Sequence, residues 1–463
     1  MPKTIWKSNK KVNLIFLAFS LIYLTTLILP QWAKAAPPLC RSDLSKSLNS
    51  ILNKEPLSHA HVGISLQTLA PPKDSLFELN SDSYFTPASN AKLFTTAAAL
   101  RFLGENFTFS TDFFFDGRNL IVVGGSDPGL STPNLVTVAA MLRQSGITKI
   151  NKLMILSEDN LSQSANTWQW GDLVFDYAAL PGTINFNQNA FGLTLTPTKV
   201  GQLVDLSFSD PRLAAFLQIN NMVRSERDHG LVEVIGNLKS NNIELRGSIN
   251  QPVTLGLAIP LIEDYFLDSF AQILKETGIS VAKVSKTDTM PVGYHKITQF
   301  HSPPLSEIIK TINQDSNNFY AEALFNLLKS KSGSIKESLG IKADSFFLID
   351  GSGLSREDLA SPRSIVETLR MVAESKQSSI YKDSLALAGQ SGTLRNRFKG
   401  TAVEGKLWAK SGTLSGVSAL SGYLNPPNYQ PLVFSILVNQ SPSPNLRQTI
   451  DEIIQLFSQL SPC

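Results

Sequence analysis

The chain has 463 residues, more than one hydrophobic core usually organises, so two or three domains are expected. Its composition is ordinary for a globular protein, and its formal net charge of +3 favours neither nucleic acid nor an acidic partner. Five histidines without an HExxH pattern, together with only two cysteines, argue against a metallohydrolase.

The first residues carry the pattern of an export signal. A lysine-rich start precedes an uncharged, mostly apolar run from Val12 to Leu29, and Ala33-Lys34-Ala35 then supplies the small residues that a signal peptidase requires. We therefore predict a signal peptide over residues 1–36, which places the rest of the chain in the periplasm or cell envelope. The apolar run nearly reaches membrane-spanning length, so an uncleaved anchor and peripheral contact with the membrane stay open.

Two cysteines lie at opposite ends of the mature sequence, Cys40 near its start and Cys463 at the last residue. Domain termini are often close in space, and an exported protein meets an oxidising compartment. We predict a disulfide bond between these two cysteines; two free thiols are the alternative.

The predicted elements fall into three stretches of the chain. The first has strands at 62–69 and 75–79 and a helix that begins near Ser89 and runs to Leu100. From 107 to 295, short apolar runs alternate with turn residues, which indicates largely β structure with one helix at 262–277. The third has helices at 305–328, 361–373 and 445–460 and strands at 406–410, 419–424 and 432–438. The two outer stretches predict one α/β domain that a long insertion interrupts.

The first of three short motifs is Ser89-x-x-Lys92. Pro87 stands where a helix can begin, and residues three apart share a helix face, so the Lys92 amine can approach the Ser89 hydroxyl. A lysine in a desolvated site loses preference for its charged form and can accept a proton. The same spacing occurs three more times in the chain, but only Ser89 opens a long apolar helical run.

The second motif is Ser316-Asn317-Asn318, at the start of a helical segment. A hydroxyl near a nucleophile can relay a proton to a leaving amine. An amide two residues further on can hold a substrate backbone, because it both donates and accepts hydrogen bonds. The alternative for Ser316 is a plain N-cap, which serine and asparagine favour.

The third motif, Lys410-Ser411-Gly412-Thr413, closes a predicted strand. A cation and two hydroxyls beside a glycine suit the capture of a terminal carboxylate, since the glycine lets a substrate lie close to the strand. The backbone N–H groups of Thr413 and Ser89 would together form an oxyanion hole. A similar sequence at Lys331 follows a helix and precedes no strand, and we discount it.

The order of the three motifs is more informative than any one of them. SxxK, SxN and KSG, with K-T-G as the usual form of the third, are typical of class A β-lactamases and penicillin-binding proteins. Together they resemble the D-Ala-D-Ala carboxypeptidase/endopeptidase family of low-molecular-mass class C penicillin-binding proteins. The resemblance covers essentially the whole mature chain and includes residues 124–128, 168–172, 184–189, 350–355, 392–398 and 409–423.

This resemblance implies a fold. The expected architecture is α/β of the α+β type: a transpeptidase/β-lactamase-like domain with a central antiparallel sheet flanked by helices, interrupted by a largely β inserted region. The long separation of the first two motifs fits this family, whereas class A β-lactamases keep that gap short. The implied parts are the catalytic domain at 37–106 and 296–463, inserted domain II at 107–188 and 256–295, and inserted domain III at 189–255.

The resemblance also implies a reaction. The chain would be a serine-type D-Ala-D-Ala carboxypeptidase, and an endopeptidase, acting on peptidoglycan stem peptides. Ser89 would form the acyl-enzyme, Lys92 would accept its proton, and Ser316 would pass a proton to the leaving nitrogen. No cofactor is implied, and β-lactams would inhibit by acylating Ser89.

Substrate binding is implied at further positions. Asn318 would orient the acyl part, while Lys410, Ser411 and Thr413 would bind the terminal carboxylate. In relatives, an aromatic-and-acid cluster of the inserted region recognises the free end of a diamino acid side chain, and Asp172 is the acid of that cluster here. The alternative for Asp172 is a loop cap beside core aromatics.

Two other functions stay open from the sequence. A serine β-lactamase or esterase on the same scaffold would need rapid deacylation, which usually requires an added general base, and no dedicated one is obvious. A non-catalytic wall-binding protein would have a decayed site. The intact residue types of all three motifs argue against decay.

Overall fold

The computed structural model describes residues 38–156, 166–228, 230–237, 239–333, 335–341 and 344–463. The predicted signal peptide therefore lies outside the described residues. Within these ranges, no helix combines the length and apolar character needed to cross a membrane.

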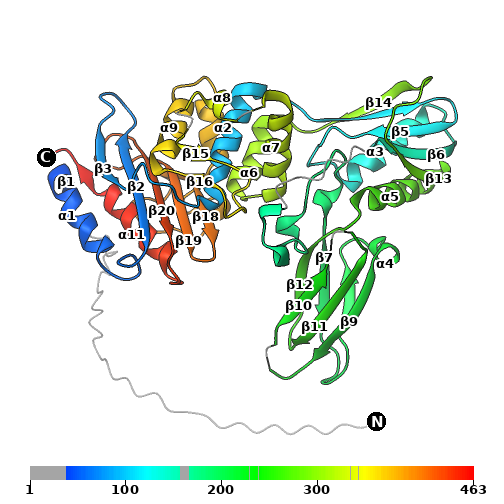
Figure 1. The fold of residues 1–463 in the computed structure, drawn as a ribbon, viewed down its shortest axis with the longest axis horizontal. Coiled ribbons are helices and arrows are strands. Elements are labelled where there is room, and N and C mark those ends of the chain that lie inside the picture. Colours follow the sequence, from blue (N-terminus) through cyan, green and yellow to red (C-terminus); the bar gives the residue numbers. More distant parts are fainter. Residues whose placement is uncertain (1–37, 157–165, 229, 238, 334, 342–343) are drawn as a thin grey trace, which may run out of the picture. The chain divides into compact units, whose positions relative to one another are not determined.

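A six-stranded antiparallel sheet is built from both outer stretches of the chain, with the order β17-β18-β19-β20-β2-β3 (Figure 1). It confirms the predicted central antiparallel sheet. Its strands are β2 (His61–Thr68), β3 (Ser75–Leu79), β17 (Ala386–Leu387), β18 (Leu407–Leu414), β19 (Val417–Leu424) and β20 (Leu432–Asn439).

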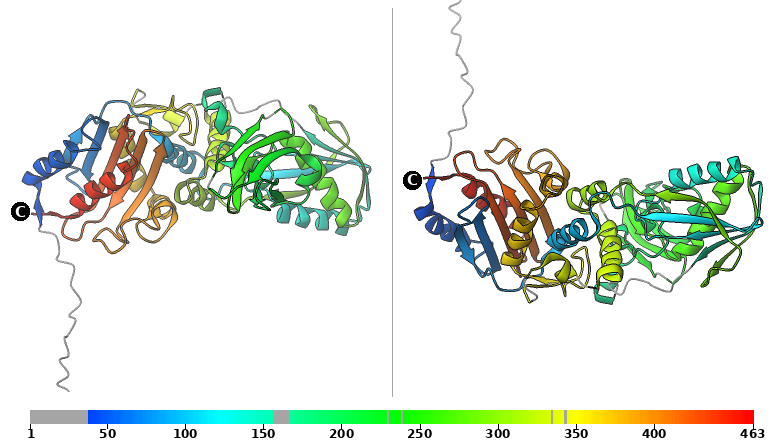
Figure 2. Two further views of the ribbon diagram at one scale, coloured as in Figure 1. Left: turned by 90° about the horizontal axis from the view of Figure 1, so that it is seen from below. Right: turned by 90° about the horizontal axis from the view of Figure 1, so that it is seen from above.

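Both faces of this sheet are buried. In β20, Val433 and Leu437 pack into one core, and Phe434 and Ile436 pack into another, because side chains alternate between the faces of a strand. Helices cover each face, as Figures 1 and 2 show. The first face carries α2 (Ala91–Leu103), α6 (Leu305–Gln314), α7 (Asn318–Ser332) and α9 (Pro362–Ala373), and the second carries α1 (Arg41–Leu52) and α11 (Leu446–Ser458).

Short elements complete this part of the chain. Strand β1 pairs in parallel with β21, and β15 pairs antiparallel with β16. The bounds are β1 (Leu39–Cys40), β21 (Leu460–Ser461), β15 (Phe346–Phe347), β16 (Leu359–Ala360), α8 (Ile335–Leu339), α10 (Ser378–Ser384), and the 3₁₀ turns η1 (Ala88–Asn90) and η6 (Gly392–Leu394).

The inserted region contains a five-stranded mixed sheet, of order β13-β6-β5-β4-β14, on which α3 and α5 pack. Its alternating apolar runs predicted strands, and the predicted helix at 262–277 is confirmed as α5. The elements are β4 (Ser110–Phe115), β5 (Asn119–Val123), β6 (Lys149–Leu156), β13 (Ser280–Thr287), β14 (His295–His301), α3 (Thr132–Gln144) and α5 (Ile262–Glu276).

Two three-stranded sheets follow, of order β12-β7-β8 and β10-β11-β9. Their elements are β7 (Ala190–Thr196), β8 (Asp205–Phe208), β12 (Val253–Ala258), β9 (Gln218–Ser225), β10 (Val232–Gly236), β11 (Asn242–Ile249) and α4 (Leu213–Phe216). Three 3₁₀ turns also lie in the inserted region: η3 (Trp170–Asp172), η4 (Asp176–Ala178) and η5 (Asn187–Asn189).

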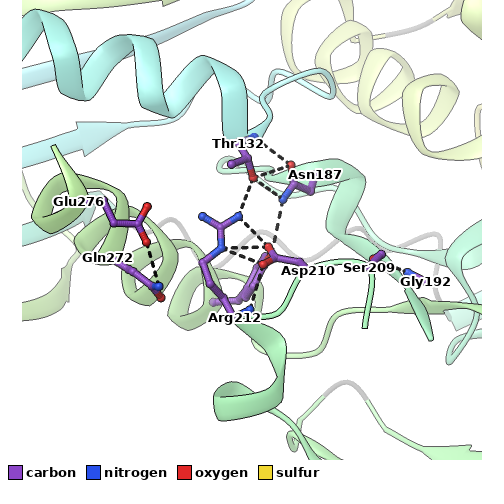
Figure 3. Close-up of polar contacts among 9 residues, drawn as sticks. Thr132, Asn187, Gly192, Ser209, Asp210, Arg212, Gln272 and Glu276 are labelled. Atoms are coloured by element: carbon purple, nitrogen blue, oxygen red, sulfur yellow. Dashed lines mark hydrogen bonds and ion pairs between the residues drawn. The ribbon is translucent and has the colours of Figure 1, made fainter. Parts of the chain in front are cut away.

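A mostly buried ion pair links the sheets of the inserted region to its helices (Figure 3). Arg212 donates to both carboxylate oxygens of Asp210 and, from Nη2, to Thr132 Oγ1 at 2.9 Å. The Tyr265 hydroxyl of α5 donates to the same carboxylate at 2.9 Å, and the Thr132 amide donates to Asn187 Oδ1 at 3.0 Å. The starts of α3 and η5 are thereby fixed to the turn that follows β8.

Two strands cross the domain boundaries that we predicted. Strand β14 runs to His301 and pairs with β4, and β12 runs to Ala258 and pairs with β7. The pairing of each sheet therefore continues beyond the predicted boundaries at 295 and 255. The division into three domains stays a proposal, with these two boundaries moved to the ends of the strands.

The two chain ends are joined covalently. A disulfide bond connects Cys40 with Cys463, which confirms the predicted pairing over the alternative of free thiols. The parallel pair β1–β21 lies directly beside it, with Cys40 opposite Ser461. A crosslink between such distant residues restricts the unfolded chain, which is the main source of its stabilising effect.

We expect Cys463→Ser to lower the free energy of unfolding by about 2–4 kcal/mol, because the unfolded chain regains the entropy of an open loop. Denaturant titration measures this change. Cys40→Ser and the double variant are the controls, and all three should be equally stable. A variant as stable as the wild-type protein, or alkylation of both cysteines without reductant, would contradict the bond.

Candidate active site

Ser89 lies in the 3₁₀ turn η1, directly before α2, so the helix predicted to begin near Ser89 begins at Ala91. Two glycines allow this turn to pack closely. A Cβ on Gly353 would lie 1.8 Å from the Ala88 carbonyl oxygen, and one on Gly412 would lie 3.0 Å from the Pro87 oxygen. The turn is therefore held between the 350–355 loop and β18.

Lys92 is fully buried in the first turn of α2, and its ammonium has three hydrogen-bond acceptors. The Nζ atom lies 3.0 Å from Ser89 Oγ, 2.7 Å from Asn318 Oδ1 and 2.6 Å from the Ser352 carbonyl oxygen. The spacing of the first motif thus brings the amine to the hydroxyl, as predicted. A second contact, to Asn318, joins the first motif to the second.

Burial lowers the pKa of Lys92 to about 7, because the apolar surroundings disfavour the charged ammonium. Three buried carboxylates oppose this effect and raise the pKa, in the order Asp350, Asp358 and Glu322. A lysine with a pKa near neutrality exchanges protons readily under ordinary conditions.

Ser316 adopts a left-handed backbone conformation, with φ of 60°, between α6 and α7. Its hydroxyl donates to Ser89 Oγ at 3.1 Å. The N-cap of α7 is Asn317, whose Oδ1 accepts from the Tyr320 amide at 2.9 Å, so the plain-cap alternative for Ser316 is wrong. Non-glycine residues seldom adopt this conformation, and such exceptions cluster at functional sites.

Lys410 is the second fully buried lysine of the site. Its Nζ lies 2.9 Å from Ser316 Oγ and 2.9 Å from the Ser411 carbonyl oxygen. Burial, and then the charge of Lys92, hold the pKa of Lys410 well below its usual range. The four polar groups of Lys92, Ser89, Ser316 and Lys410 form a continuous hydrogen-bonded row.

Ser411 and Thr413 lie along the end of β18 that faces Ser89. The Ser411 hydroxyl donates to Thr393 Oγ1 at 2.8 Å, and Thr413 is exposed. Strand β17 pairs with β18 only at Trp408 and Ala409, so in the described structure no strand pairs with this end of β18 on its β17 side. An open strand edge is a ready site for an added peptide strand.

A hollow of about 430 Å³ joins the serine pair to the inserted region. Asp172 lines it and accepts from the Tyr177 hydroxyl at 2.8 Å, while the Tyr177 carbonyl accepts from Asn318 Nδ2 at 2.8 Å. Trp170, two residues before this acid, is 79% exposed. Asp172 and Tyr177 therefore lie at the edge of the site, Trp170 does not line the hollow, and both functions of the Asn318 amide are engaged.

The sequence motifs did not reveal how Lys92 is positioned. Asp350 accepts from the amides of Ser352, Gly353 and Ser355 and so shapes the loop that presents the Ser352 carbonyl to Lys92. Trp168 of the inserted region donates to the same carboxylate at 2.7 Å. The sequence did contain a signal for these two residues, because Asp350 and Trp168 each begin a segment that carries the family resemblance. Neither segment indicates that the two side chains contact each other.

In the part of the chain that the structure describes, no three or more His, Cys, Asp or Glu side chains form a cluster that could hold a metal ion. Arg397, which lies between the second and third motifs, forms an ion pair with Asp451.

The fold and the row of serines and lysines define a serine acyl-transferase of the penicillin-binding class. Residues 44–460 match the model of the D-Ala-D-Ala carboxypeptidase 3 (S13) family. The chain belongs to this family, and it is a serine-type carboxypeptidase.

Individual relatives agree with this assignment. The chain is 29% identical to penicillin-sensitive carboxypeptidase A of Dictyostelium discoideum, over 83% of this chain and 84% of the relative. It is 26% identical to the D-alanyl-D-alanine carboxypeptidase of Actinomadura sp. strain R39, over 87% and 82%. The crystal structure of penicillin binding protein 4 from Haemophilus influenzae has the same fold, with a TM-score of 0.79, 23% identity, and coverage of 91% of this chain and 99% of that one.

We expect the side chain of Lys92 to titrate near pH 7 in NMR spectra of lysine-labelled protein, whereas exposed lysines titrate above pH 10. Lys92→Met identifies the signal. Asp350→Asn should move the midpoint to lower pH, because it removes the carboxylate that raises the pKa of Lys92 most.

The control for this titration is Asp288→Asn, which removes an exposed carboxylate from the inserted region. It should leave the midpoint unchanged. A wild-type midpoint above pH 10, or equal midpoints in the wild-type and Asp350→Asn proteins, would show that burial and this carboxylate do not control the charge of Lys92.

Proposed function

We propose that the protein removes the terminal D-Ala from peptidoglycan stem peptides through an acyl-enzyme on Ser89. One observation carries this proposal: the Ser89 hydroxyl lies 3.0 Å from a buried lysine amine and 3.1 Å from a second serine hydroxyl. A nucleophile with a base on one side and a proton relay on the other is the arrangement that acyl transfer requires.

In the first step, neutral Lys92 takes the proton of Ser89 as the oxygen attacks the carbonyl of the penultimate D-Ala. The lowered pKa of Lys92 makes the neutral amine available near pH 7. The backbone N–H groups of Ser89 and Thr413 would stabilise the oxyanion. The carbonyl carbon then carries two oxygens and the nitrogen of the leaving residue.

In the second step, the amide bond breaks and the leaving nitrogen receives a proton from Ser316. Lys410 donates to the Ser316 hydroxyl at 2.9 Å, so it orients this relay and stabilises the transient loss of its proton. Free D-Ala departs, and an ester joins the peptide to Ser89. Ser316 regains a proton from the Lys92 ammonium, so both groups return to their starting states. Water then hydrolyses the ester, with neutral Lys92 again placed to accept a proton.

The open edge of β18 supports the proposed binding mode. The stem peptide would add to this edge as an extended strand, with Ser411, Thr413 and the Lys410 amine at its terminal carboxylate. Asn318 would orient the acyl part. Its amide is already held by Lys92 and the Tyr177 carbonyl, so its orientation is set before substrate arrives.

β-Lactams would acylate the same serine, since they imitate D-Ala-D-Ala and carry a carboxylate at the corresponding position.

Action on peptidoglycan would place the enzyme in the cell envelope, and the pattern of residues 1–36 supports export to the periplasm. Cleavage of cross-links, the endopeptidase reaction, would follow the same steps with a larger amine as leaving group.

We expect one penicillin molecule to add covalently to the wild-type protein and none to Ser89→Ala, because the variant lacks the attacking oxygen. Intact-protein mass spectrometry measures the adduct. Ser280→Ala, which removes an exposed serine of a chance SxxK sequence in the inserted region, is the matched control and should be labelled like the wild-type protein.

Fast turnover of penicillin without an adduct would favour the β-lactamase alternative. Labelling of Ser89→Ala, or neither adduct nor turnover in the wild-type protein, would contradict the proposed nucleophile and favour a wall-binding protein without catalysis.

We also propose that Asp172 binds the free ammonium of a diamino acid side chain in the acyl part. Asp172→Asn should then raise KM about tenfold for a peptide with this amine free, because a charge-assisted hydrogen bond is lost. The acetylated peptide is the control substrate and should be cleaved equally by both proteins. An equal loss on both peptides would indicate the loop-capping alternative instead.

A further inference from the structure

A second hollow, of about 310 Å³, opens from the serine pair on the side of the third motif. Ser89, Ser316, Ser411 and Thr413 line it. Its lining also includes three residues that the proposed reaction does not use, namely Thr393, Arg397 and Arg447. The hollow therefore adjoins both the reacting serines and the proposed carboxylate site.

Two charged residues line this hollow, and both are arginines. They differ in whether another side chain pairs with them. Arg397 is 11% exposed and forms an ion pair with Asp451, which fixes it and offsets its charge. Arg447 lies in the first turn of α11, is exposed, and has no hydrogen-bond or ion-pair partner among the described residues. It is therefore available to bind an anion.

Two other hollows at the serine pair differ in the charge of the side chains that line them. The 430 Å³ hollow contains Asp172 together with Arg356, and a third, of about 630 Å³, contains Asp176 and Asp315 and no basic side chain. Of these three hollows, only the one beside the third motif is lined by basic side chains and by no carboxylate.

This side is where the leaving group would lie. Ser316 would protonate the leaving nitrogen, and Ser411 and Thr413 would hold the carboxylate on the adjacent carbon, so anything attached beyond that carbon extends into the hollow. The methyl group of a terminal D-Ala fills little of the space and has no charge for Arg447. Given the proposed function, the hollow accommodates a leaving residue that is larger and more acidic than D-Ala.

We propose that this hollow is a subsite for leaving groups that carry a second carboxylate, such as the amine-bearing residue of an adjoining cross-linked peptide, and that Arg447 recognises this carboxylate. The bonds that change are those of the proposed function: the D-Ala amide breaks, the Ser89 ester forms, and the proton goes to the leaving amine. Arg447 is a specificity residue, which acts on the choice of leaving group and not on the chemistry.

The test uses three peptides with one acyl part and a different final residue: D-Ala, D-Gln or D-Glu. D-Gln and D-Glu have nearly the same size, so their comparison isolates the second carboxylate. We expect Arg447→Gln to lower kcat/KM for the D-Glu peptide about fivefold, which is typical of an exposed ion pair, and to leave the D-Gln and D-Ala peptides unchanged. The effect should shrink as salt is added.

Arg395→Gln is the matched control, because Arg395 is exposed in the same segment as Thr393 but does not line the hollow. It should leave all three rates unchanged. Equal effects of Arg447→Gln on D-Glu and D-Gln peptides, or no effect on either, would overturn the subsite. Penicillin acylation distinguishes failure of the subsite from failure of the proposed function, because unchanged acylation of Arg447→Gln shows that the nucleophile is intact. Peptide hydrolysis by Ser89→Ala would overturn both the subsite and the proposed function.

Discussion

The burial of the Lys92 ammonium is the constraint on which the site depends. An ammonium removed from water is costly unless acceptors surround it, and here a hydroxyl, an amide oxygen and a carbonyl oxygen do so. Each acceptor comes from a different part of the fold: η1, α7 and the 350–355 loop. The same burial that lowers the pKa therefore requires three segments, far apart in the chain, to meet within hydrogen-bond distance.

The inserted region contributes to this arrangement from outside the catalytic sheet. Trp168 donates to the Asp350 carboxylate, and the Tyr177 carbonyl accepts from the Asn318 amide. Both contacts end on groups that position Lys92, one through the loop carbonyl and one directly. The inserted region is thus part of the support of the site as well as a wall of its hollows.

Local patterns in the sequence predicted most of the fold and the motif residues, because apolar periodicity and the SxxK spacing depend on neighbours in the chain. Three features did not follow from such patterns. The left-handed conformation of Ser316 moves the helix cap to Asn317, and the role of Asp350 depends on a tryptophan from the inserted region. The arginine of the second hollow, Arg447, joins the site only because α11 packs on one face of the central sheet. All three depend on long-range contacts.

The order of strands in the catalytic sheet governs when activity can arise. β2 and β20 are adjacent in space but come from opposite ends of the described chain, and the β18 edge also emerges late. A chain synthesised from its N-terminus contains Ser89 early, yet the sheet around this serine cannot close until β18 to β20 have followed. Long-range pairing of this kind also folds slowly. Hydrolase activity can therefore arise only when synthesis and folding of the chain are nearly complete.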